Sequence, residues 1–304
     1  MKKYILHILL FFAIVAVMDV CFGKAYDYMV SHAKGGSTKA EYDLLMKDKY
    51  DVVIMGSSRA THHYIPQIIE DSLGVTCYNA GADGNGIVLM YGRYKLITQR
   101  YNPRVIIYDV EPAFDINENS EDDHNRRYLA SLKEYFFEPG IKEIFTDVSW
   151  AEGVKNYSGL FRYNGKYFNI ARDFVTAQTH SAKGYLPLQG EMSKEPEEKE
   201  NPERTLDSLK LRYVKELATD AKSRGIEFIF IASPKYGAES TTIQAVKDIA
   251  DEVGIPFWDY TEDARFQKWE YFKEPMHLND KGAHEYSEKI AERLRGALIL
   301  KNEI

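Results

Sequence analysis

A short apolar stretch that ends in a glycine constrains the fold of this chain more than any other feature. Residues 52–55, VVIM, follow Asp51 and are too few for a helix, so they predict a buried strand. Gly56 then allows a sharp turn, and Ser57 and Ser58 follow it. Serine at such a turn is also a good helix N-cap, so the pair has a structural as well as a functional interpretation. Open α/β sheets bind ligands outside the carboxyl ends of their strands, which would put these serines at the mouth of a site.

Strand and helix patterns alternate on both sides of the middle third of the chain. Buried strands are predicted at residues 52–55, 75–78, 105–110, 226–232 and 256–258. Helices are predicted at residues 39–49, 64–73, 87–100, 206–224 and 242–253, with a last helix after Asn279 as its N-cap. This alternation is typical of a parallel sheet with helices on its faces. The fold class is therefore α/β, and we expect a flavodoxin-like three-layer sandwich with about five strands.

The regular pattern is interrupted by an insertion at about residues 113–205. This insertion is rich in aromatic residues without clean periodicity, and these could stack on sugar rings or fill a local core. It ends in a charged, proline-containing run at residues 191–204, which we expect to be a solvated loop. The predicted organisation is an N-terminal segment of residues 1–33, followed by an α/β domain of residues 34–304 that the insertion divides.

The N-terminal segment carries an apolar run. Lys2 and Lys3 precede residues 4–18, which are almost all apolar, and Asp19 follows them. A run of this length lies between the core of a signal peptide and a complete membrane span. The two lysines favour a cytoplasmic N-terminus and an exported remainder. We therefore expect a single membrane anchor with a short tether, which keeps the domain outside the cytoplasm, and a cleaved signal peptide is the alternative.

Composition argues against some classes of partner. A formal net charge of −7 gives no basic surface for a nucleic acid. The chain has two cysteines. Cys21 lies in the apolar N-terminal segment and Cys77 in a predicted strand, so we expect no disulfide between them. The sequence contains no CxxC pair that would hold zinc, and nothing in it indicates the oligomeric state.

A glutamate and a histidine precede the final helix. Glu274 and His277 are three residues apart in the loop after the last predicted strand. A carboxylate so placed can bend back to hold one ring nitrogen, which leaves the other nitrogen free to take a proton from a serine. This loop and the turn after the first strand belong to the same edge of the predicted sheet, so we expect His277 within hydrogen-bonding reach of Ser58. The alternative is that His277 only bonds to backbone at the entry of the helix.

With these blocks in this order, the sequence resembles the SGNH (GDSL-type) hydrolase superfamily over residues 51–112 and 206–298. The first matching block is Gly56-Ser57-Ser58, where the family has Gly-Asp-Ser. The second is Asn79, followed five residues later by Gly84. The last is Glu274-Pro275-Met276-His277, where the family has Asp-x-x-His. The third family block, Gly-x-Asn-Asp, is absent from the strand end at residues 108–112. Residues 56–60 also nearly fit the nucleophile elbow of α/β-hydrolases, but there the acid and the histidine lie on separate loops.

The resemblance implies a Ser-His-Glu triad in which Ser58 is the nucleophile, His277 the base and Glu274 the acid. The groups that it assigns to the oxyanion hole are the backbone amides of Ser58 and Gly84, with Asn85 or Asn79 in place of the missing side-chain donor. It implies no metal and no organic cofactor. Both esterases and acyltransferases would use such a triad, because they form the same acyl-enzyme.

Three further residues are candidates for substrate contacts: Arg59, Asn79 and Asp109. Arg59 could bind an anionic group or pair with Asp83 or Asp109. Asp109, at the end of a predicted strand, could orient a site residue or bond to loop amides. His62 and His63 are adjacent on a predicted helix start and have no third ligand nearby, so we interpret them as a solvated pair rather than metal ligands.

Together these features predict a membrane-anchored, extracytoplasmic serine esterase or O-acyltransferase of SGNH type. The resemblance, together with the location outside the cytoplasm, implies an acylated, for example acetylated, cell-envelope glycan as the substrate. The alternative is a catalytically inactive anchored module of the same fold that binds a glycan or an envelope protein. The missing third block and the serine at position 57 favour that alternative.

Overall fold

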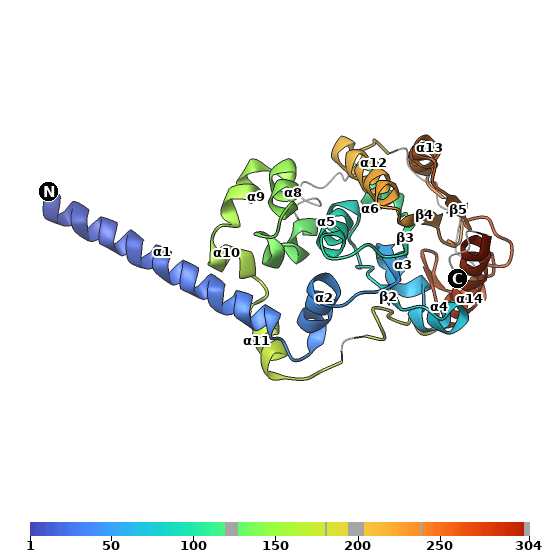
Figure 1. The fold of residues 1–304 in the computed structure, drawn as a ribbon, viewed down its shortest axis with the longest axis horizontal. Coiled ribbons are helices and arrows are strands. Elements are labelled where there is room, and N and C mark those ends of the chain that lie inside the picture. Colours follow the sequence, from blue (N-terminus) through green and yellow to red (C-terminus); the bar gives the residue numbers. More distant parts are fainter. Residues whose placement is uncertain (119–126, 180, 194–203, 238, 301–304) are drawn as a thin grey trace. The chain divides into compact units, whose positions relative to one another are not determined.

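Two compact units make up the chain in the computed structural model, which describes residues 1–118, 127–179, 181–193, 204–237 and 239–300 (Figure 1). We call Met1–Lys47 with Asn125–His180 the N-terminal unit. Asp48–His124 with Ser181–Ile304 form the sheet unit. The middle of the insertion therefore groups with the N-terminal segment, whereas the sequence predicted only that it interrupts the α/β domain.

Five parallel strands form the centre of the sheet unit. They are β1 (Val52–Gly56), β2 (Cys77–Asn79), β3 (Val105–Asp109), β4 (Glu227–Ala232) and β5 (Phe257–Asp259). Their order, β2-β1-β3-β4-β5, is that of flavodoxin-like folds, which confirms the predicted fold class. In such folds a ligand crevice lies at the carboxyl ends of the strands where the order reverses, here between β1 and β3.

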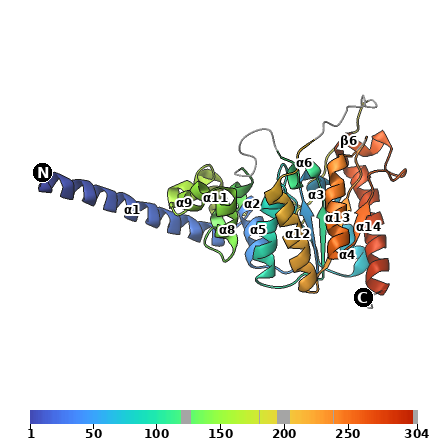
Figure 2. The same ribbon diagram turned by 90° about the horizontal axis from the view of Figure 1, so that it is seen from above.

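Helices cover both faces of this sheet (Figure 2). One layer contains α5 (Ile87–Thr98), α12 (Ser208–Ser223) and α13 (Gln244–Val253), and the other contains α4 (Pro66–Leu73) and α14 (Asp280–Leu300). The shorter elements are α3 (Ser58–His63), α6 (Pro112–Asp115), the 3-10 turns Thr241–Ile243 and Trp269–Tyr271, and an antiparallel pair, β6 (Phe272–Glu274) and β7 (His277–Leu278). Every residue of β1 and β3 is buried, as expected for strands covered on both faces.

Helices alone form the N-terminal unit among its described residues. They are α1 (Lys2–Ser31), α2 (Gly36–Met46), α8 (Ile141–Val148), α9 (Trp150–Lys155), α10 (Gly159–Tyr163) and α11 (Tyr167–Val175), with 3-10 turns at Leu129–Ser131 and Lys133–Tyr135. Phe136, Phe145 and Tyr163 are buried, so part of the insertion's aromatic content fills a local core. Within the described part of the chain, α1 is the only helix long and apolar enough to cross a membrane.

Local boundaries differ from the prediction at a few places. The helix expected at residues 64–73 begins only at Pro66, because the residue before a proline avoids the helical region, and α3 precedes it as a separate turn. The β6–β7 pair was not predicted, because strands of three and two residues are too short to show an alternation of apolar and polar residues. The N-cap at Asn279 is confirmed, because its Oδ1 accepts the Gly282 amide at 3.0 Å. The loop expected at 191–204 lies largely outside the described residues.

Candidate active site

The carboxyl end of β1 carries Ser58 to the edge of the sheet. Gly56 has a φ of +141°, and a Cβ there would lie 2.5 Å from the Asp109 carbonyl oxygen, so glycine lets β1 turn this close to β3. Ser57 is the extended residue before α3, and Ser58 is its first helical residue. The Ser57 side chain is buried, whereas Ser58 is partly exposed. The turn therefore presents one of its two serines to solvent.

The β6–β7 pair places His277 against this serine. His277 Nε2 lies 2.6 Å from Ser58 Oγ, and His277 Nδ1 is hydrogen-bonded to Glu274. Because a carboxylate only accepts hydrogen bonds, Nδ1 carries the proton and Nε2 is left to accept the serine hydroxyl. Glu274 is itself held by the Met276 amide, which donates to Oε2 at 3.0 Å. Three side chains from two distant parts of the chain thus form one hydrogen-bonded series.

Glu274 is held in its charged form. Partial burial by itself would raise the pKa of this carboxyl. The hydrogen bonds from His277 and from the Met276 amide, together with the charges of His277 and His62, outweigh burial and lower the pKa below its ordinary value. A carboxylate in this position stabilises a proton on the histidine ring.

A loop that follows β2 runs beside the end of β1. The Ala80 amide donates to the Ile54 carbonyl at 2.7 Å, and the Ala82 amide to the Gly56 carbonyl at 3.1 Å. The turn that follows contains Gly84 with a φ of +65°, and it is closed by a hydrogen bond from the Asn85 amide to the Ala82 carbonyl. The loop carrying Gly84 is thereby held beside β1, the strand that ends at the serine turn. The roles of Gly84 and Asn85 in an oxyanion hole remain predictions.

Asn79 supports this loop rather than facing a substrate. Its Nδ2 donates to the carbonyls of Ala60 and Tyr64, at 2.6 and 3.0 Å, and its Oδ1 accepts the Gly81 amide at 3.0 Å. The side chain is 1% exposed. The expectation that Asn79 contacts substrate or supplies an oxyanion donor is therefore wrong, because both ends of its amide are used inside the fold. Asn85, by contrast, is partly exposed and donates to the Asp83 carbonyl at 2.9 Å.

The two histidines of α3 are buried, so their interpretation as a solvated pair is wrong. His62 faces two acceptors, the Leu186 carbonyl at 2.6 Å from Nδ1 and Asp83 Oδ2 at 3.2 Å from Nε2. Both nitrogens must carry protons to satisfy these acceptors. Burial lowers the pKa of His62, but these hydrogen bonds and the charges of Asp83 and Glu274 raise it above its ordinary value overall. Its ring lies edge-to-face with that of His277, with centroids 5.5 Å apart.

His63 holds the segment that carries His277. Its Nε2 accepts the Leu278 amide at 2.9 Å, so the proton lies on Nδ1, which donates to Ser233 Oγ at 3.0 Å. Helix α3 therefore carries the serine and also fixes the residue next to the histidine. Complete burial, followed by the charges of His277, Arg59 and His62, lowers the pKa of His63 well below its ordinary value. The sequence analysis did not predict that His62 and His63 lie beside the serine and the histidine of the candidate site. A signal was present for His62, which follows Ser58 by four residues, the spacing that puts side chains on one helix face.

The opposite pKa shifts of the two histidines predict opposite pH dependences of stability. Folded His63 stays neutral while the unfolded chain takes up a proton below about pH 6.5, so its share of the unfolding free energy falls as pH drops, by at most about 1.4 kcal/mol per pH unit. His62, with its raised pKa, contributes stability below about pH 6.5 that is lost as pH rises through its folded pKa. We therefore expect His63→Gln to lose less stability than the wild type between pH 7.5 and 5.5, and His62→Gln to lose more. Urea unfolding at both pH values measures this, and a His63→Gln variant with the steeper fall would contradict the assignment.

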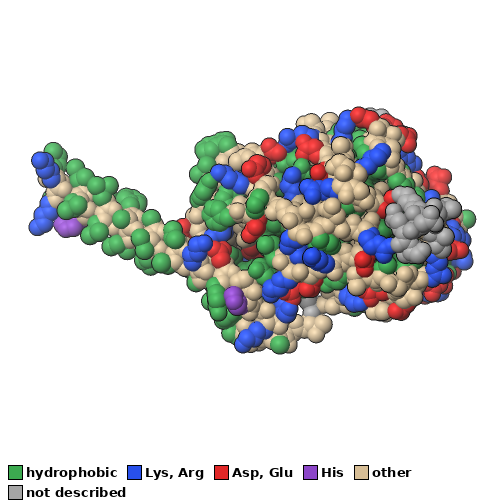
Figure 3. All heavy atoms as spheres, in the orientation of Figure 1, with side chains coloured by type: hydrophobic (Ala, Val, Ile, Leu, Met, Phe, Trp, Pro, Cys, Tyr) green, Lys and Arg blue, Asp and Glu red, His purple; other side chains and the backbone are tan. Residues whose placement is uncertain are grey.

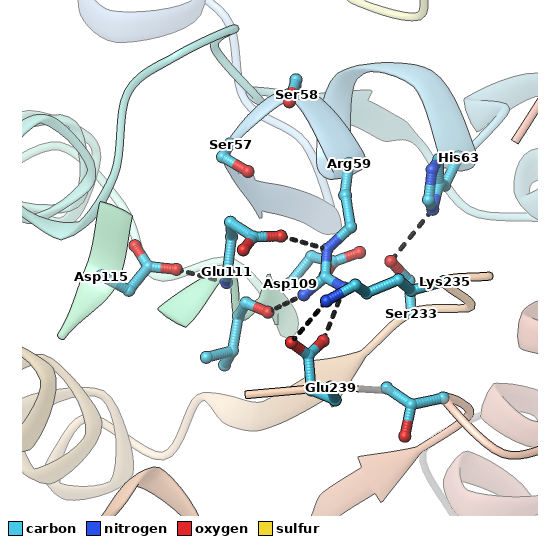
Figure 4. A network of polar contacts seen from close by, with 12 residues as sticks. Ser57, Ser58, Arg59, His63, Asp109, Glu111, Asp115, Ser233, Lys235 and Glu239 are labelled. Carbon is cyan, nitrogen blue, oxygen red and sulfur yellow. Dashed lines mark hydrogen bonds and ion pairs between the residues drawn. The ribbon is translucent and has the colours of Figure 1, made fainter. Parts of the chain in front are cut away.

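Below the serine turn, Arg59 is part of a buried network of charges (Figure 4). Its guanidinium pairs with Glu111 at 2.8 Å and Glu239 at 2.9 Å, lies 3.8 Å from Asp109, and donates to the Val110 carbonyl. The side chain is 1% exposed. Of the predicted alternatives, pairing with Asp109 is confirmed and pairing with Asp83 is wrong, since Asp83 bonds to His62. Because Arg59 is buried and surrounded by carboxylates, it does not bind an anionic substrate group.

Asp109 belongs to the same network. It is completely buried, and burial raises the pKa of its carboxyl, while the charge of Arg59 opposes that rise. A substrate contact for Asp109 is therefore wrong, because the carboxyl has no access to solvent. Lys235, at 3.5 Å from Glu239, adds a second positive charge. The third family block would stand directly after β3. In this chain the residues there bind Arg59 instead, through the Glu111 carboxylate and the Val110 carbonyl.

Comparisons with known proteins find similarity to solved structures only. No family model matches the sequence, and no curated protein matches it significantly. The chain is similar to a GDSL-like lipase from Bacteroides thetaiotaomicron, with a TM-score of 0.38 and 12% identity over 81% of this chain and 88% of that one. It is also similar to an acetylxylan esterase from Geobacillus stearothermophilus, solved as a catalytic mutant, with a TM-score of 0.40 and 12% identity over 80% of this chain and 92% of that one. Because these scores are low, we base the function on the geometry of the site.

Proposed function

We propose that the sheet unit is a serine ester hydrolase of SGNH type, with Ser58, His277 and Glu274 as its triad. The observation that carries the proposal is the hydrogen-bonded series from Ser58 Oγ through both ring nitrogens of His277 to Glu274. This series supplies a nucleophile, a base within 2.6 Å of it, and a third group that orients the base. A histidine that only capped the last helix would not place its free nitrogen on a serine.

In the proposed reaction, Ser58 Oγ attacks the ester carbonyl carbon while its proton moves to His277 Nε2. Glu274 stabilises the imidazolium that forms. The tetrahedral intermediate then breaks its bond to the alcohol oxygen, which leaves with the proton from Nε2, and the acyl group stays on Ser58. Water then attacks the acyl carbon while its proton moves to His277 Nε2, the bond from this carbon to Ser58 Oγ breaks, and Oγ takes the proton back from Nε2 as the acid is released. A sugar hydroxyl in place of water would give acyl transfer instead.

The developing oxyanion needs hydrogen-bond donors. Ser58 is the first residue of α3, and the first amides of a helix have no carbonyl partner within the helix, so its N–H is available. We assign the second donor to the Gly84 amide and the third to the Asn85 side chain, both on the loop that runs beside β1. The loss of one side-chain donor typically lowers kcat by about a hundredfold or more. A slower enzyme is therefore the expected consequence if Asn85 does not reach the oxyanion.

The location and the substrate form the finer part of the proposal. Helix α1 has 30 residues, and the side chains of its apolar run are exposed in the structure. We propose that it anchors the protein in a membrane with Lys2 and Lys3 on the cytoplasmic side, so that the sheet unit and the rest of the N-terminal unit lie outside the cytoplasm. An acylated envelope glycan is the substrate class that this location favours. Cleavage of α1 as a signal peptide would release the same enzyme.

Active-site labelling tests the proposal. Full-length protein in detergent micelles is treated with a fluorophosphonate and, separately, with p-nitrophenyl acetate and an acetylated xylo-oligosaccharide. We expect the fluorophosphonate to attach to the peptide that contains Ser58, as located by mass spectrometry, and at least one ester to be cleaved. His277→Asn, which removes the base, should prevent both. Binding of the oligosaccharide without labelling or ester cleavage would instead establish the inactive module.

A further inference from the structure

The exposed hydrophobic side chains of this protein are concentrated in the N-terminal unit. Outside the apolar run of α1, the large hydrophobic residues that are exposed in the described part of this unit are Met1, Val20, Tyr28, Phe137, Trp150, Val154, Tyr157, Leu160, Phe168 and Val175. In the described part of the sheet unit, Leu206 alone belongs to this class. Trp150 is 76% exposed, which is unusual for the largest apolar side chain. Figure 3 shows hydrophobic side chains gathered on the surface over α8 and α9.

Four of these residues lie in one short segment, which we call the 150–160 patch: Trp150, Val154, Tyr157 and Leu160. Trp150 and Val154 are four residues apart on α9 and therefore share a helix face. The Tyr157 amide donates to the Val154 carbonyl at 3.2 Å, and this turn leads directly into α10. The four residues therefore lie on consecutive turns of one short segment.

This patch lies where the apolar run of α1 ends. Asp19, the first residue after the run, accepts hydrogen bonds from Ser158 Oγ at 2.8 Å, the Gly159 amide at 3.0 Å and the Leu160 amide at 2.8 Å. A Cβ on Gly159 would lie 2.6 Å from Gly23 Cα, so α10 packs directly on the backbone of α1. On the N-terminal side of this contact, the apolar run of α1 is not buried by any part of the chain that the structure describes. A membrane that holds the run would therefore end beside the patch.

The residue types of the patch fit the boundary between lipid headgroups and acyl chains. Trp and Tyr are enriched at this boundary because their rings are apolar and their N–H and O–H groups are polar. Lysine side chains can extend from such a surface toward the headgroups. Lys142 is exposed and its Nζ lies 4.9 Å from the centre of the Tyr157 ring, and the exposed Lys155 lies 5.7 Å from that of Phe161.

We propose that the 150–160 patch lies in the lipid interface of the membrane crossed by α1, so that the insertion supports the anchor as well as interrupting the sheet unit. This inference rests on the proposed anchor and is independent of the proposed esterase activity. Contact with lipid explains why Trp150 is exposed although a buried aromatic core is available in the same unit. The patch adjoins the end of the apolar run, because the Leu160 amide donates to Asp19, and this position favours lipid over a protein partner.

Fluorescence quenching by spin-labelled lipid tests the proposal. The full chain is reconstituted in phosphatidylcholine nanodiscs with and without lipid labelled at acyl carbon 5. The chain has three tryptophans, and Trp258 and Trp269 lie in the sheet unit with Trp258 only 6% exposed. The emission of Trp150 is obtained as the difference between the wild type and Trp150→Phe. We expect the label to reduce this difference about twofold or more, because an interfacial ring lies near carbon 5, and to change the Trp150→Phe emission little.

A second variant separates the patch from the anchor. Phe11→Trp in the Trp150→Phe background puts a tryptophan inside the apolar run, and lipid labelled at carbon 12 should quench it. If that tryptophan is quenched and Trp150 is not, the patch faces water or a protein partner and the proposal is overturned. If neither is quenched, α1 does not enter the bilayer, and the proposal fails together with the anchor. Neither outcome bears on the triad, because fluorescence requires no turnover.

Discussion

Replacing Ser58 with alanine is expected to lower kcat/KM for an ester by about a thousandfold or more and to abolish fluorophosphonate labelling, because no nucleophile remains next to His277. The hydroxyl removed is the one that lies 2.6 Å from His277 Nε2. Initial rates with p-nitrophenyl acetate and labelling of the same preparation measure the two effects. Circular dichroism of the variant should match the wild type, since Ser58 is partly exposed and its loss leaves no buried cavity.

Ser57→Ala is the matched control for this prediction. Ser57 is adjacent in sequence and completely buried, and its Oγ has no hydrogen-bond partner in the described structure. Alanine there removes a buried hydroxyl without breaking a bond, so we expect activity within a few-fold of the wild type. If Ser57→Ala lost labelling and Ser58→Ala kept it, the assignment of the nucleophile would be wrong. Equal rates for wild type and Ser58→Ala would favour the inactive module.

The sheet could be predicted because its signals are local. Residues 52–55 and 105–110 are short apolar runs bounded by turn residues, and burial on both faces is what such runs require. The same local signals made it possible to place three side chains together, because each lies at or next to the end of a predicted strand: Ser58, Glu274 and His277. In the sheet unit, α3, α6 and the β6–β7 pair were missed because they are too short to show a period.

The surroundings of Ser58, His277 and Glu274 could not be predicted, because they depend on pairs that are distant in sequence. Arg59 pairs with Glu239 across 180 positions, and His63 binds the Leu278 amide across 215. Adjacent histidines at a helix start give no signal that distinguishes a solvated pair from a buried one. The grouping of the insertion with α1 could not be predicted for the same reason, because Asp19 accepts hydrogen bonds from the distant Ser158 hydroxyl and from the Gly159 and Leu160 amides.

These distant pairs explain how a short helix can hold the geometry of the candidate site. Residues of α3 make three separate attachments: Arg59 to Glu111, which follows β3, His62 to the Leu186 carbonyl, and His63 to the Leu278 amide. The first fixes α3 to the sheet, and the last fixes β7, which carries His277, to α3. The separation between serine and histidine is therefore set by buried polar contacts as well as by apolar packing.

Arg59→Met is expected to lower the unfolding free energy of the sheet unit by about 3–5 kcal/mol, the cost of removing one partner of a buried ion pair. Methionine fills much of the volume but leaves Glu111 and Asp109 without the guanidinium, and Glu239 with Lys235 alone. Burial raises the pKa of Glu111, and the charge of Arg59 is the largest effect that opposes this rise, followed by the smaller effect of Lys235. Urea unfolding followed by the emission of the buried Trp258 measures the loss.

Arg265→Met is the control for this variant, and the pH gives a second test. Arg265 pairs with Asp263 at the surface, with 56% of its side chain exposed, so its loss should cost at most about 0.5 kcal/mol. In Arg59→Met the unpaired carboxylates have raised pKa values, so the variant loses stability as pH rises above the ordinary carboxyl range, and protonation restores part of it on acidification. We therefore expect the deficit relative to the wild type to be smaller at pH 5 than at pH 8. A deficit that is equal at both pH values would mean that lost packing, rather than uncompensated charge, destabilises the variant.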